Sequence, residues 1–203
     1  MSTATSHPTA LTPEEGQWLV RLARAAIGEK LGCPLPQEQM RTLEAHLQRP
    51  IFATPCGTFV TLVLNGALRG CIGTLAAGEP LVRNVRENAV NAAFRDPRFP
   101  PLTLDEFHQV VIEVSVLSPP ESLAYADADD LLARIRPGID GLIIRKGAAS
   151  ATFLPQVWKQ LPRRQDFLSH LCLKAGLPAR AWQDGDVTVE TYQVQFFEEE
   201  HKT

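Results

Sequence analysis

Residues 57–73 read GTFVTLVLNGALRGCIG, and this stretch decides how the chain around it folds. Its first part, residues 57–65, is rich in Val, Thr and Phe, which are typical of a β-strand. Asn65-Gly66 is a dipeptide that a tight two-residue hairpin turn favours, because both residues adopt positive φ readily. The segment therefore predicts an antiparallel hairpin whose second strand covers residues 67–75.

Cys71 lies near the end of this hairpin, with Gly70 directly before it, Gly73 two positions after it and Arg69 two positions before it. Glycines on both sides let the backbone turn sharply and let a ligand approach closely. A nearby guanidinium favours the thiolate, which is the form of cysteine that attacks or binds ligands. The same residues also suit a buried cysteine at a strand-to-turn junction. Both interpretations, a reactive thiol and a packed one, stay open on the residues alone.

Apolar spacing predicts helices on either side of the hairpin. Thr12 and Pro13 supply an N-cap and a first-turn proline for a helix that ends near Gly32. Two further helices are expected over residues 37–47 and 81–94, each with an apolar stripe at helical spacing.

Strand patterns dominate the middle and the end of the chain. Residues 110–117 alternate Val and Ile with polar residues, as a half-buried strand does. Asp140-Gly141 turns into a second hairpin, formed by residues 142–144 and 149–153. The other expected elements are helices over residues 129–135, 155–160 and 164–175 and a final alternating strand over residues 187–197.

Strands separated by helices, together with two hairpins, predict an α+β fold rather than a doubly wound parallel sheet. We expect antiparallel or mixed sheets with flanking helices. Only Pro119-Pro120 is typical of a linker, so the sequence favours one compact unit over residues 13–198. Residues 1–12, rich in Ser, Thr and Pro, and the last residues, 199–203, are expected to be loose tails.

Composition and charge narrow the classes of function. Hydrophobic residues make up 44% and charged residues 21% of the 203 residues, as in a soluble globular protein. The net charge of −3 argues against a protein whose main partner is nucleic acid. No apolar run reaches the ~20 residues that a membrane helix needs. The four cysteines include no C-x-x-C pair, so we expect reduced thiols in a cytoplasmic protein.

Several blocks of the sequence resemble a known family. LRGCIG at residues 68–73 follows GTFVTL and precedes DPRFPPL at 96–102 and IEVSVLS at 112–118. Three later blocks stand in the family's order: DGLII at 140–144, FLPQV at 153–157 and FLSHLCLKAGL at 167–177. With these motifs the chain resembles the AMMECR domain family over residues 14–198.

This resemblance implies a larger and a smaller α+β lobe, with the LRGCIG motif near a groove between them. It also implies a link to the bacterial AmmeMemoRadiSam system, in which such proteins are associated with a Memo-like protein and a radical S-adenosylmethionine protein. Neither the resemblance nor the residues identify a reaction or a cofactor.

Two further side chains join Cys71 as site candidates. Glu113 lies on the polar face of strand 110–117, where a carboxylate is either exposed or placed in a site with a shifted pKa. Arg98 follows Pro97, which fixes the backbone that aims the arginine side chain. The planar guanidinium suits carboxylate and phosphate, so we expect a small anionic ligand. No His, Cys or acidic pair has the spacing of metal ligands, so no metal site is predicted.

The leading hypothesis is an enzyme, or an enzyme component, that acts on a small anionic or nucleotide-like substrate. Cys71 is expected to act as nucleophile or general acid, with Glu113 as its acid/base partner. Arg69 is expected to anchor the anion, and the full set of ligand-binding candidates is Arg69, Gly70, Gly73 and Arg98. The alternative is a non-catalytic binding or adaptor module that works with the Memo-like and radical S-adenosylmethionine proteins, in which Cys71 only packs.

Overall fold

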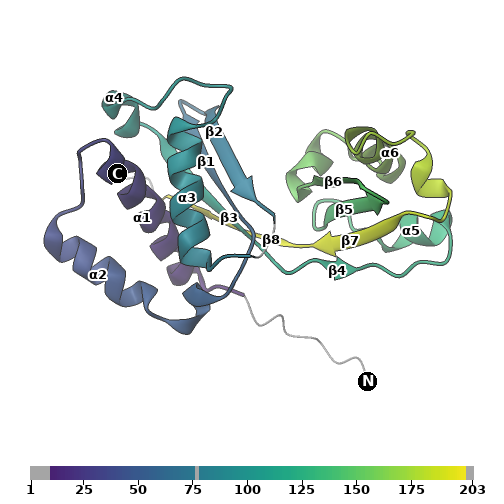
Figure 1. Ribbon diagram of the computed structural model, residues 1–203, viewed down its shortest axis with the longest axis horizontal. Coiled ribbons are helices and arrows are strands. Elements are labelled where there is room, and N and C mark those ends of the chain that lie inside the picture. Colours follow the sequence, from purple (N-terminus) through teal and green to yellow (C-terminus); the bar gives the residue numbers. More distant parts are fainter. Residues whose placement is uncertain (1–9, 76–77, 200–203) are drawn as a thin grey trace. The chain divides into compact units, whose positions relative to one another are not determined.

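The computed structural model describes residues 10–75 and 78–199, and it divides into two compact units (Figure 1). The first unit contains the described residues up to Ser118 together with those from Gln195 onward, and the second contains Pro119–Val194. Each unit has its own four-stranded sheet and its own hydrophobic core. The expected α+β fold with antiparallel sheets is confirmed.

The sheet of the first unit has the strand order β2-β1-β3-β8. Its hairpin turns at Asn65 and Gly66, whose φ angles are 52° and 76°. Positive φ at both positions is what the expected two-residue turn requires. The strands are β1 (Thr58–Leu64), β2 (Ala67–Thr74), β3 (Val111–Leu117) and β8 (Val194–Glu198).

Helices cover one face of this sheet. Figure 1 shows α1 and α3 side by side, and both contact the strands beneath them. Their apolar faces bury Val60, Leu62, Ile112 and Val114, which alternate along β1 and β3. The helices of this unit are α1 (Pro13–Lys30), α2 (Gln37–Leu47), α3 (Leu81–Phe94), α4 (Leu104–Phe107) and a 3-10 helix, Pro50–Ala53.

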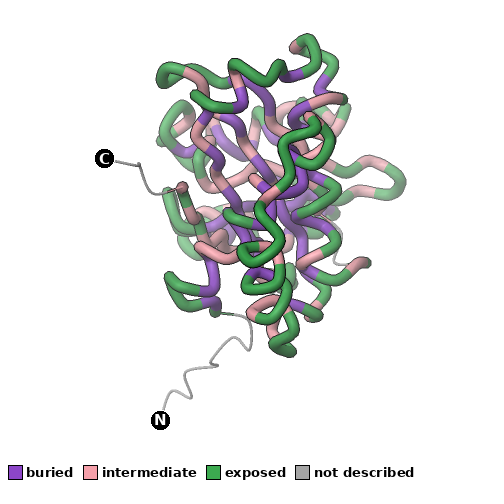
Figure 2. The backbone as a smooth tube through the Cα atoms, turned by 90° about the vertical axis from the view of Figure 1, so that its left-hand side faces the viewer, coloured by how far each residue is buried: buried purple, intermediate pink, exposed green. Residues whose placement is uncertain are grey.

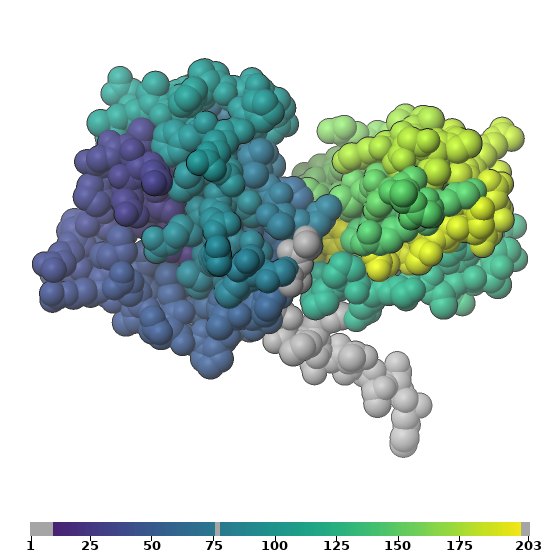
Figure 3. Space-filling model, viewed as in Figure 1, coloured from purple at the N-terminus to yellow at the C-terminus, as the bar shows by residue number. Residues whose placement is uncertain are grey.

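Burial differs among these helices. Figure 2 marks the buried residues in purple and the exposed ones in green along the chain. The helix α2 buries only Leu43 and forms part of the surface of the first unit (Figure 3). The α2 helix therefore adds less to the core than α1 and α3 do.

A bulge interrupts the pairing of β1 with β2. Leu62 lies opposite Gly70, and the next residue, Val63, lies opposite Leu68, so Arg69 is left without a partner on β1. A bulge of this kind bends the strand and re-aims the side chain of the extra residue. The Arg69 side chain consequently does not follow the alternating directions of the other side chains in β2.

The second unit builds its sheet in the order β4-β7-β5-β6 around the expected second hairpin. In its core, Trp158 stacks on Phe167 with ring centroids 3.7 Å apart. The strands are β4 (Glu121–Ser122), β5 (Gly141–Lys146), β6 (Ala149–Phe153) and β7 (Thr188–Tyr192). The helices are α5 (Ala128–Arg134), α6 (Arg164–Lys174) and two 3-10 helices, Pro155–Lys159 and Ala181–Gln183.

One expected element is wrong. The alternating segment 187–197 is not a single strand: it breaks at Gln193 into β7 and β8, which belong to different sheets. Alternation has the same period in both sheets, so the pattern does not reveal a change of sheet.

Smaller differences concern helices. The expected helix 155–160 is a 3-10 helix. The short α4 was not expected, although Thr103 and Glu106 form a capping box whose T-x-x-E spacing is visible in the sequence.

The expected tails lie mostly outside the described residues, which exclude 1–9 and 200–203. Leu11 is buried, and its N–H donates to the side-chain oxygen of Gln195 at 2.8 Å. Glu199 pairs with Arg24. Both ends of the described chain are therefore attached to the first unit. Within the described residues, none of the helices has the length and apolar character needed to cross a bilayer.

Candidate functional site

The backbone of Cys71 is held by an ion pair from the segment after α3. Asp96 accepts a hydrogen bond from the Cys71 N–H at 2.9 Å, and Nη2 of Arg98 donates to the Cys71 carbonyl at 3.2 Å. Because β2 is an edge strand, these two backbone groups have no neighbouring strand to bind. Asp96 and Arg98 take the place of that strand.

Asp96 and Arg98, here called the Asp96–Arg98 clamp, both carry their charges. Arg98 donates from Nε to Oδ1 of Asp96 at 2.9 Å and from Nη2 to Oδ2 at 2.6 Å, while the Asp96 carboxylate is almost fully buried. The hydrogen bond from Arg98, with a smaller one from the Cys71 N–H, holds the pKa of Asp96 far below its ordinary value against the opposing effect of burial. Asp96 is therefore charged at neutral pH.

The Cys71 thiol is half-buried and has a hydroxyl as its neighbour. Thr61 Oγ1 donates to Cys71 Sγ at 3.3 Å. Thr61 lies directly opposite Cys71 on one side and directly opposite Glu113 on the other. Directly opposite residues point to the same face of a sheet, so the three side chains form a row across β2, β1 and β3. With about 4.8 Å between neighbouring strands, the backbones of Cys71 and Glu113 are about 10 Å apart.

Glu113 lies at the end of this row, and its carboxyl keeps its proton more readily than an exposed glutamate does. The side chain is half-buried, and burial, followed by the negative charge of Glu198, raises the pKa of Glu113. A raised pKa brings a carboxyl toward the range in which it can donate a proton near neutral pH.

Arg69, expected to anchor a ligand, binds protein groups in this structure. Its buried guanidinium donates from Nε and Nη2 to the two carboxylate oxygens of Glu106, at 2.8 and 2.9 Å, and from Nη2 to the Pro100 carbonyl at 3.0 Å. The hydrogen bond from Arg69 lowers the pKa of Glu106 to about 2. Arg69 thus connects the bulge of β2 to α4, and the anion that it holds is a carboxylate of the same chain.

The two glycines beside Cys71 are explained by close approach of protein atoms. A Cβ on Gly70 would lie 2.3 Å from the carbonyl oxygen of Ala92 in α3, and a Cβ on Gly73 would lie 2.1 Å from the ring of Phe59. The sequence indicated a close approach at both positions, and the structure identifies a helix backbone and an aromatic ring as the approaching groups.

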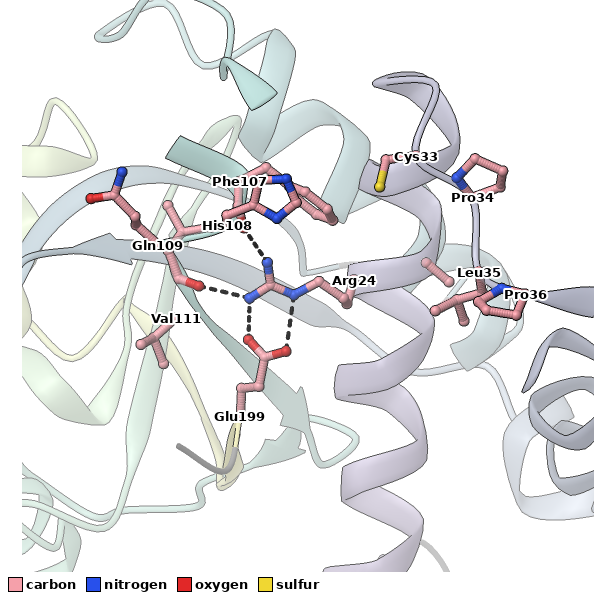
Figure 4. Close-up of a pocket in the computed structure, with 12 residues that line it drawn as sticks. Arg24, Cys33, Pro34, Leu35, Pro36, Phe107, His108, Gln109, Val111 and Glu199 are labelled. Atoms are coloured by element: carbon pink, nitrogen blue, oxygen red, sulfur yellow. Dashed lines mark hydrogen bonds and ion pairs between the residues drawn. The ribbon is translucent and has the colours of Figure 1, made fainter. Parts of the chain in front are cut away.

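A separate cavity of about 440 Å³ lies beside α1 (Figure 4). Figure 4 shows the Arg24 guanidinium pointing from α1 to Glu199, with which it forms an ion pair. Arg24 also donates to the backbone carbonyls of Phe107 and Val110. Sequence reasoning missed this group because Arg24 and Glu199 are 175 positions apart. Cys71 does not line the cavity, and the charge of Arg24 is already matched by Glu199.

No cluster of three or more His, Cys, Asp or Glu side chains suited to a metal ion occurs in residues 10–75 and 78–199. The candidate site therefore consists of the row Cys71–Thr61–Glu113 and the Asp96–Arg98 clamp. Thr61 and Asp96 were not among the candidates selected from the sequence. Asp96 belongs to the D-P-R pattern and Glu106 to the T-x-x-E pattern, both of which are visible in consecutive residues. The strand register that brings Thr61 to Cys71 has no such signal in the sequence.

Comparison with known proteins gives a consistent picture. The AMMECR1 family model matches residues 20–197. A Methanopyrus kandleri protein is 41% identical over 198 residues, which cover 94% of this chain and 91% of that protein. A Methanothermobacter thermautotrophicus protein is 40% identical over 192 residues, with coverages of 94% and 97%. The crystal structure of an uncharacterized Pyrococcus horikoshii protein matches with a TM-score of 0.78 and 39% identity, over 94% of each chain.

Proposed function

The chain belongs to the AMMECR1 family, and on this premise we propose that it is an enzyme, or a component of one, that uses the Cys71 thiol on a small anionic or nucleotide-like substrate. One observation carries the proposal: the thiol is half-buried, accepts a hydrogen bond from Thr61, and shares a sheet face with the carboxyl of Glu113. A nucleophile and a proton donor on one rigid surface are the minimum that covalent catalysis requires.

Arg98 is the anion anchor in this proposal. Its side chain is 52% exposed, and Nε and Nη2 are bound to Asp96 and Cys71. Among the described residues Nη1 donates to no protein acceptor, which leaves it available to a ligand. The Arg98 guanidinium also donates to the Cys71 carbonyl at 3.2 Å, so an anionic group bound to Arg98 lies close to Cys71.

Arg69, Gly70 and Gly73 have a supporting part. Arg69 fixes the bulge of β2 through Glu106, and the glycines allow α3 and Phe59 to pack tightly around the strand. A site held by packed elements keeps its geometry when a substrate binds.

The chemistry is a group transfer. The thiolate of Cys71 supplies the electron pair of a new bond to an electrophilic carbon or phosphorus atom of the substrate. The leaving group departs with the electrons of the broken bond and receives the proton of Glu113. A second nucleophile, an O–H or N–H group, then attacks the transferred group and gives its proton to the Glu113 carboxylate, while Cys71 leaves as the thiolate with the electrons of the broken bond to sulfur.

Alkylation with iodoacetamide, followed at each cysteine by peptide mass spectrometry, tests the activated thiol. Cys33 is exposed and serves as the internal reference, whereas burial raises the pKa of Cys56 and of Cys172. The readout is the pH at which each rate reaches half its maximum, because this value does not depend on access. If the thiol is activated, this pH is lower at Cys71 than at Cys33. Equal values at the two sites would exclude an activated thiol.

The second candidate is a binding or adaptor module, and exposed apolar side chains favour it. Leu68 and Leu104 are 45% and 44% exposed, on elements that the Arg69–Glu106 pair joins. The partners to test are the Memo-like and radical S-adenosylmethionine proteins that the family resemblance implies. An adaptor predicts that these partners are retained by Cys71→Ala and lost by Leu68→Glu. Failure of the unsubstituted chain to capture either partner would exclude it.

We also place the protein in the cytoplasm. All four cysteines are free, which supports a reducing compartment.

A further inference from the structure

The side chain that faces the sulfur of Cys71 is a hydroxyl and not the guanidinium that the sequence suggested. Arg69 is engaged by Glu106, and Asp96 and Arg98 bind the backbone of Cys71. Among the described residues, the hydrogen bond from Thr61 Oγ1 is the one made to Sγ itself. We infer that Thr61 is the positioning residue that orients the Cys71 thiol and favours its thiolate, an inference that rests on the proposed function.

The chemistry of the contact supports this role. A hydroxyl has one proton to donate, and among the described residues Thr61 donates it to Cys71 Sγ and to no other acceptor. A thiolate is a much stronger acceptor than a thiol, so a donor at this position favours the charged form.

The backbone around Thr61 keeps this donor in place. Thr61 lies in β1, between two antiparallel neighbours, so its main chain is fixed on both sides. A β-branched side chain in a strand has few χ1 rotamers, which limits the directions available to the hydroxyl. The donor is therefore already placed before a substrate arrives, and no ordering of the side chain is needed at the moment of reaction.

The charged groups around Cys71 must be held constant. Asp96 and Arg98 bind the backbone of Cys71 from the segment after α3, Glu113 lies on the same sheet face in β3, and Glu198 in β8 acts on Glu113. A substitution confined to Thr61 leaves all four in place. A change in the alkylation rate of Cys71 in such a variant is therefore caused by the loss of the Thr61 hydroxyl.

The test compares Thr61→Val, which has nearly the same shape without the hydroxyl, with Thr61→Ser, which keeps the hydroxyl. Iodoacetamide alkylation of Cys71 is measured from pH 5 to 10 in the full chain, with Cys33 as internal reference. We expect Thr61→Val to slow alkylation of Cys71 at pH 7 about tenfold and to move the half-maximal rate to higher pH, as loss of a hydrogen bond to a charged group requires. Thr61→Ser should stay within about threefold of the unsubstituted protein, and Cys33 should not change in either variant.

The outcomes separate this inference from the proposed function. If the half-maximal pH of the unsubstituted Cys71 lies below that of Cys33 and Thr61→Val leaves it unchanged, the inference is wrong and the proposed function stands. If this pH at Cys71 equals or exceeds that at Cys33 in the unsubstituted protein, both are wrong. Thr61→Ala provides a second loss of the donor, so a folding defect confined to Thr61→Val does not prevent the decision, and thermal unfolding identifies such a defect.

Discussion

The two units carry equivalent rows of side chains across three strands, and the residues at their centres differ. In the first unit the row is Cys71–Thr61–Glu113, with a hydroxyl between a thiol and a carboxyl. In the second unit the corresponding row is Thr152–Ile143–Glu190, with a buried isoleucine at the centre.

The polar groups at the ends of these rows differ as well. Thr152 donates to the Leu142 carbonyl, and Glu190 pairs with Arg145, so the second row satisfies its polar groups structurally. Among the described residues Glu113 pairs with no Lys or Arg, and the negative charge of Glu198, after burial, raises its pKa. Unpaired polar groups on a rigid face are costly to fold and are typical of functional sites. The comparison supports the first unit as the place of the proposed chemistry, because the polar groups of the second row are already bound within the protein.

The largest expected effect tests how closely the first sheet is packed behind the row. Gly70→Ala places a methyl group 2.3 Å from the backbone oxygen of Ala92, which can move only if α3 moves. We expect a loss of more than ~3 kcal/mol in the free energy of unfolding, measured by urea denaturation. Gly78→Ala is the matched control, because a Cβ at Gly78 meets no atom within 4 Å.

The same substitution in the second unit sharpens the comparison. A Cβ on Gly141 would lie 2.4 Å from the ring of Tyr192, a side chain that can shift more easily than a helix backbone. Gly141→Ala should therefore cost less than Gly70→Ala. The reverse order would show that the second sheet, and not the first, is the more tightly constrained.

The next effect concerns the ion pair that ties β2 to α4. Removing the carboxylate by Glu106→Gln should lower the free energy of unfolding at pH 7 by about 1–2 kcal/mol, since Glu106 accepts two hydrogen bonds from a buried guanidinium and is itself partly exposed. The pKa of Glu106 is lowered to about 2. A carboxyl with a depressed pKa stabilises the fold above its unfolded value, about 4.3, and loses this contribution as pH falls toward the folded value.

Urea unfolding at a series of pH values checks this sign. The difference between Glu106→Gln and the unsubstituted protein should be largest at pH 7 and should shrink steadily below about pH 4. Asp130→Asn in the second unit is the control, because its partner Arg134 is 52% exposed whereas Arg69 is 9% exposed, so this pair within one helix should contribute less. A difference that does not depend on pH would mean that Glu106 acts through packing instead of charge.

The smallest effect has the opposite sign. A carboxyl whose pKa is raised in the folded state stabilises the fold while it is protonated, and this stability is lost as pH rises through the folded pKa. Glu113 is such a group, so at pH 7 its charge is unfavourable. Glu113→Gln should therefore raise the free energy of unfolding at pH 7, by up to ~0.5 kcal/mol for a partly exposed group, and the gain should disappear below about pH 4.

Glu190→Gln is the matched substitution in the second row. It removes the partner of Arg145, so a small loss of stability at pH 7 is expected in place of a gain. Chemical denaturation of both variants at pH 7 and pH 4 gives the comparison. If both substitutions lower the free energy of unfolding at pH 7, the negative charge of Glu113 is stabilised in the folded protein, as that of Glu190 is.

Much of the fold followed from local patterns. The apolar stripe of residues 37–47 predicted α2 with the bounds that the structure has, and Asn65-Gly66 predicted the hairpin turn. These features depend on the backbone preferences of neighbouring residues and on periodic burial, both of which can be recognised in consecutive positions of the sequence. The change of sheet at Gln193 has no such signal, since the sequence of a strand does not specify which strands it pairs with.

By itself, the sequence determined most of the helices, the two hairpins and the α+β class, and it selected Cys71 and Glu113 as site candidates. Only the tertiary structure decided that Arg69 binds Glu106, that Asp96 and Arg98 hold the backbone of Cys71, and that Thr61 faces its sulfur. Helix and turn formation are set within a few residues, whereas these contacts join segments 10 to 37 positions apart and depend on strand register, on a one-residue bulge and on the packing of α3 and α4.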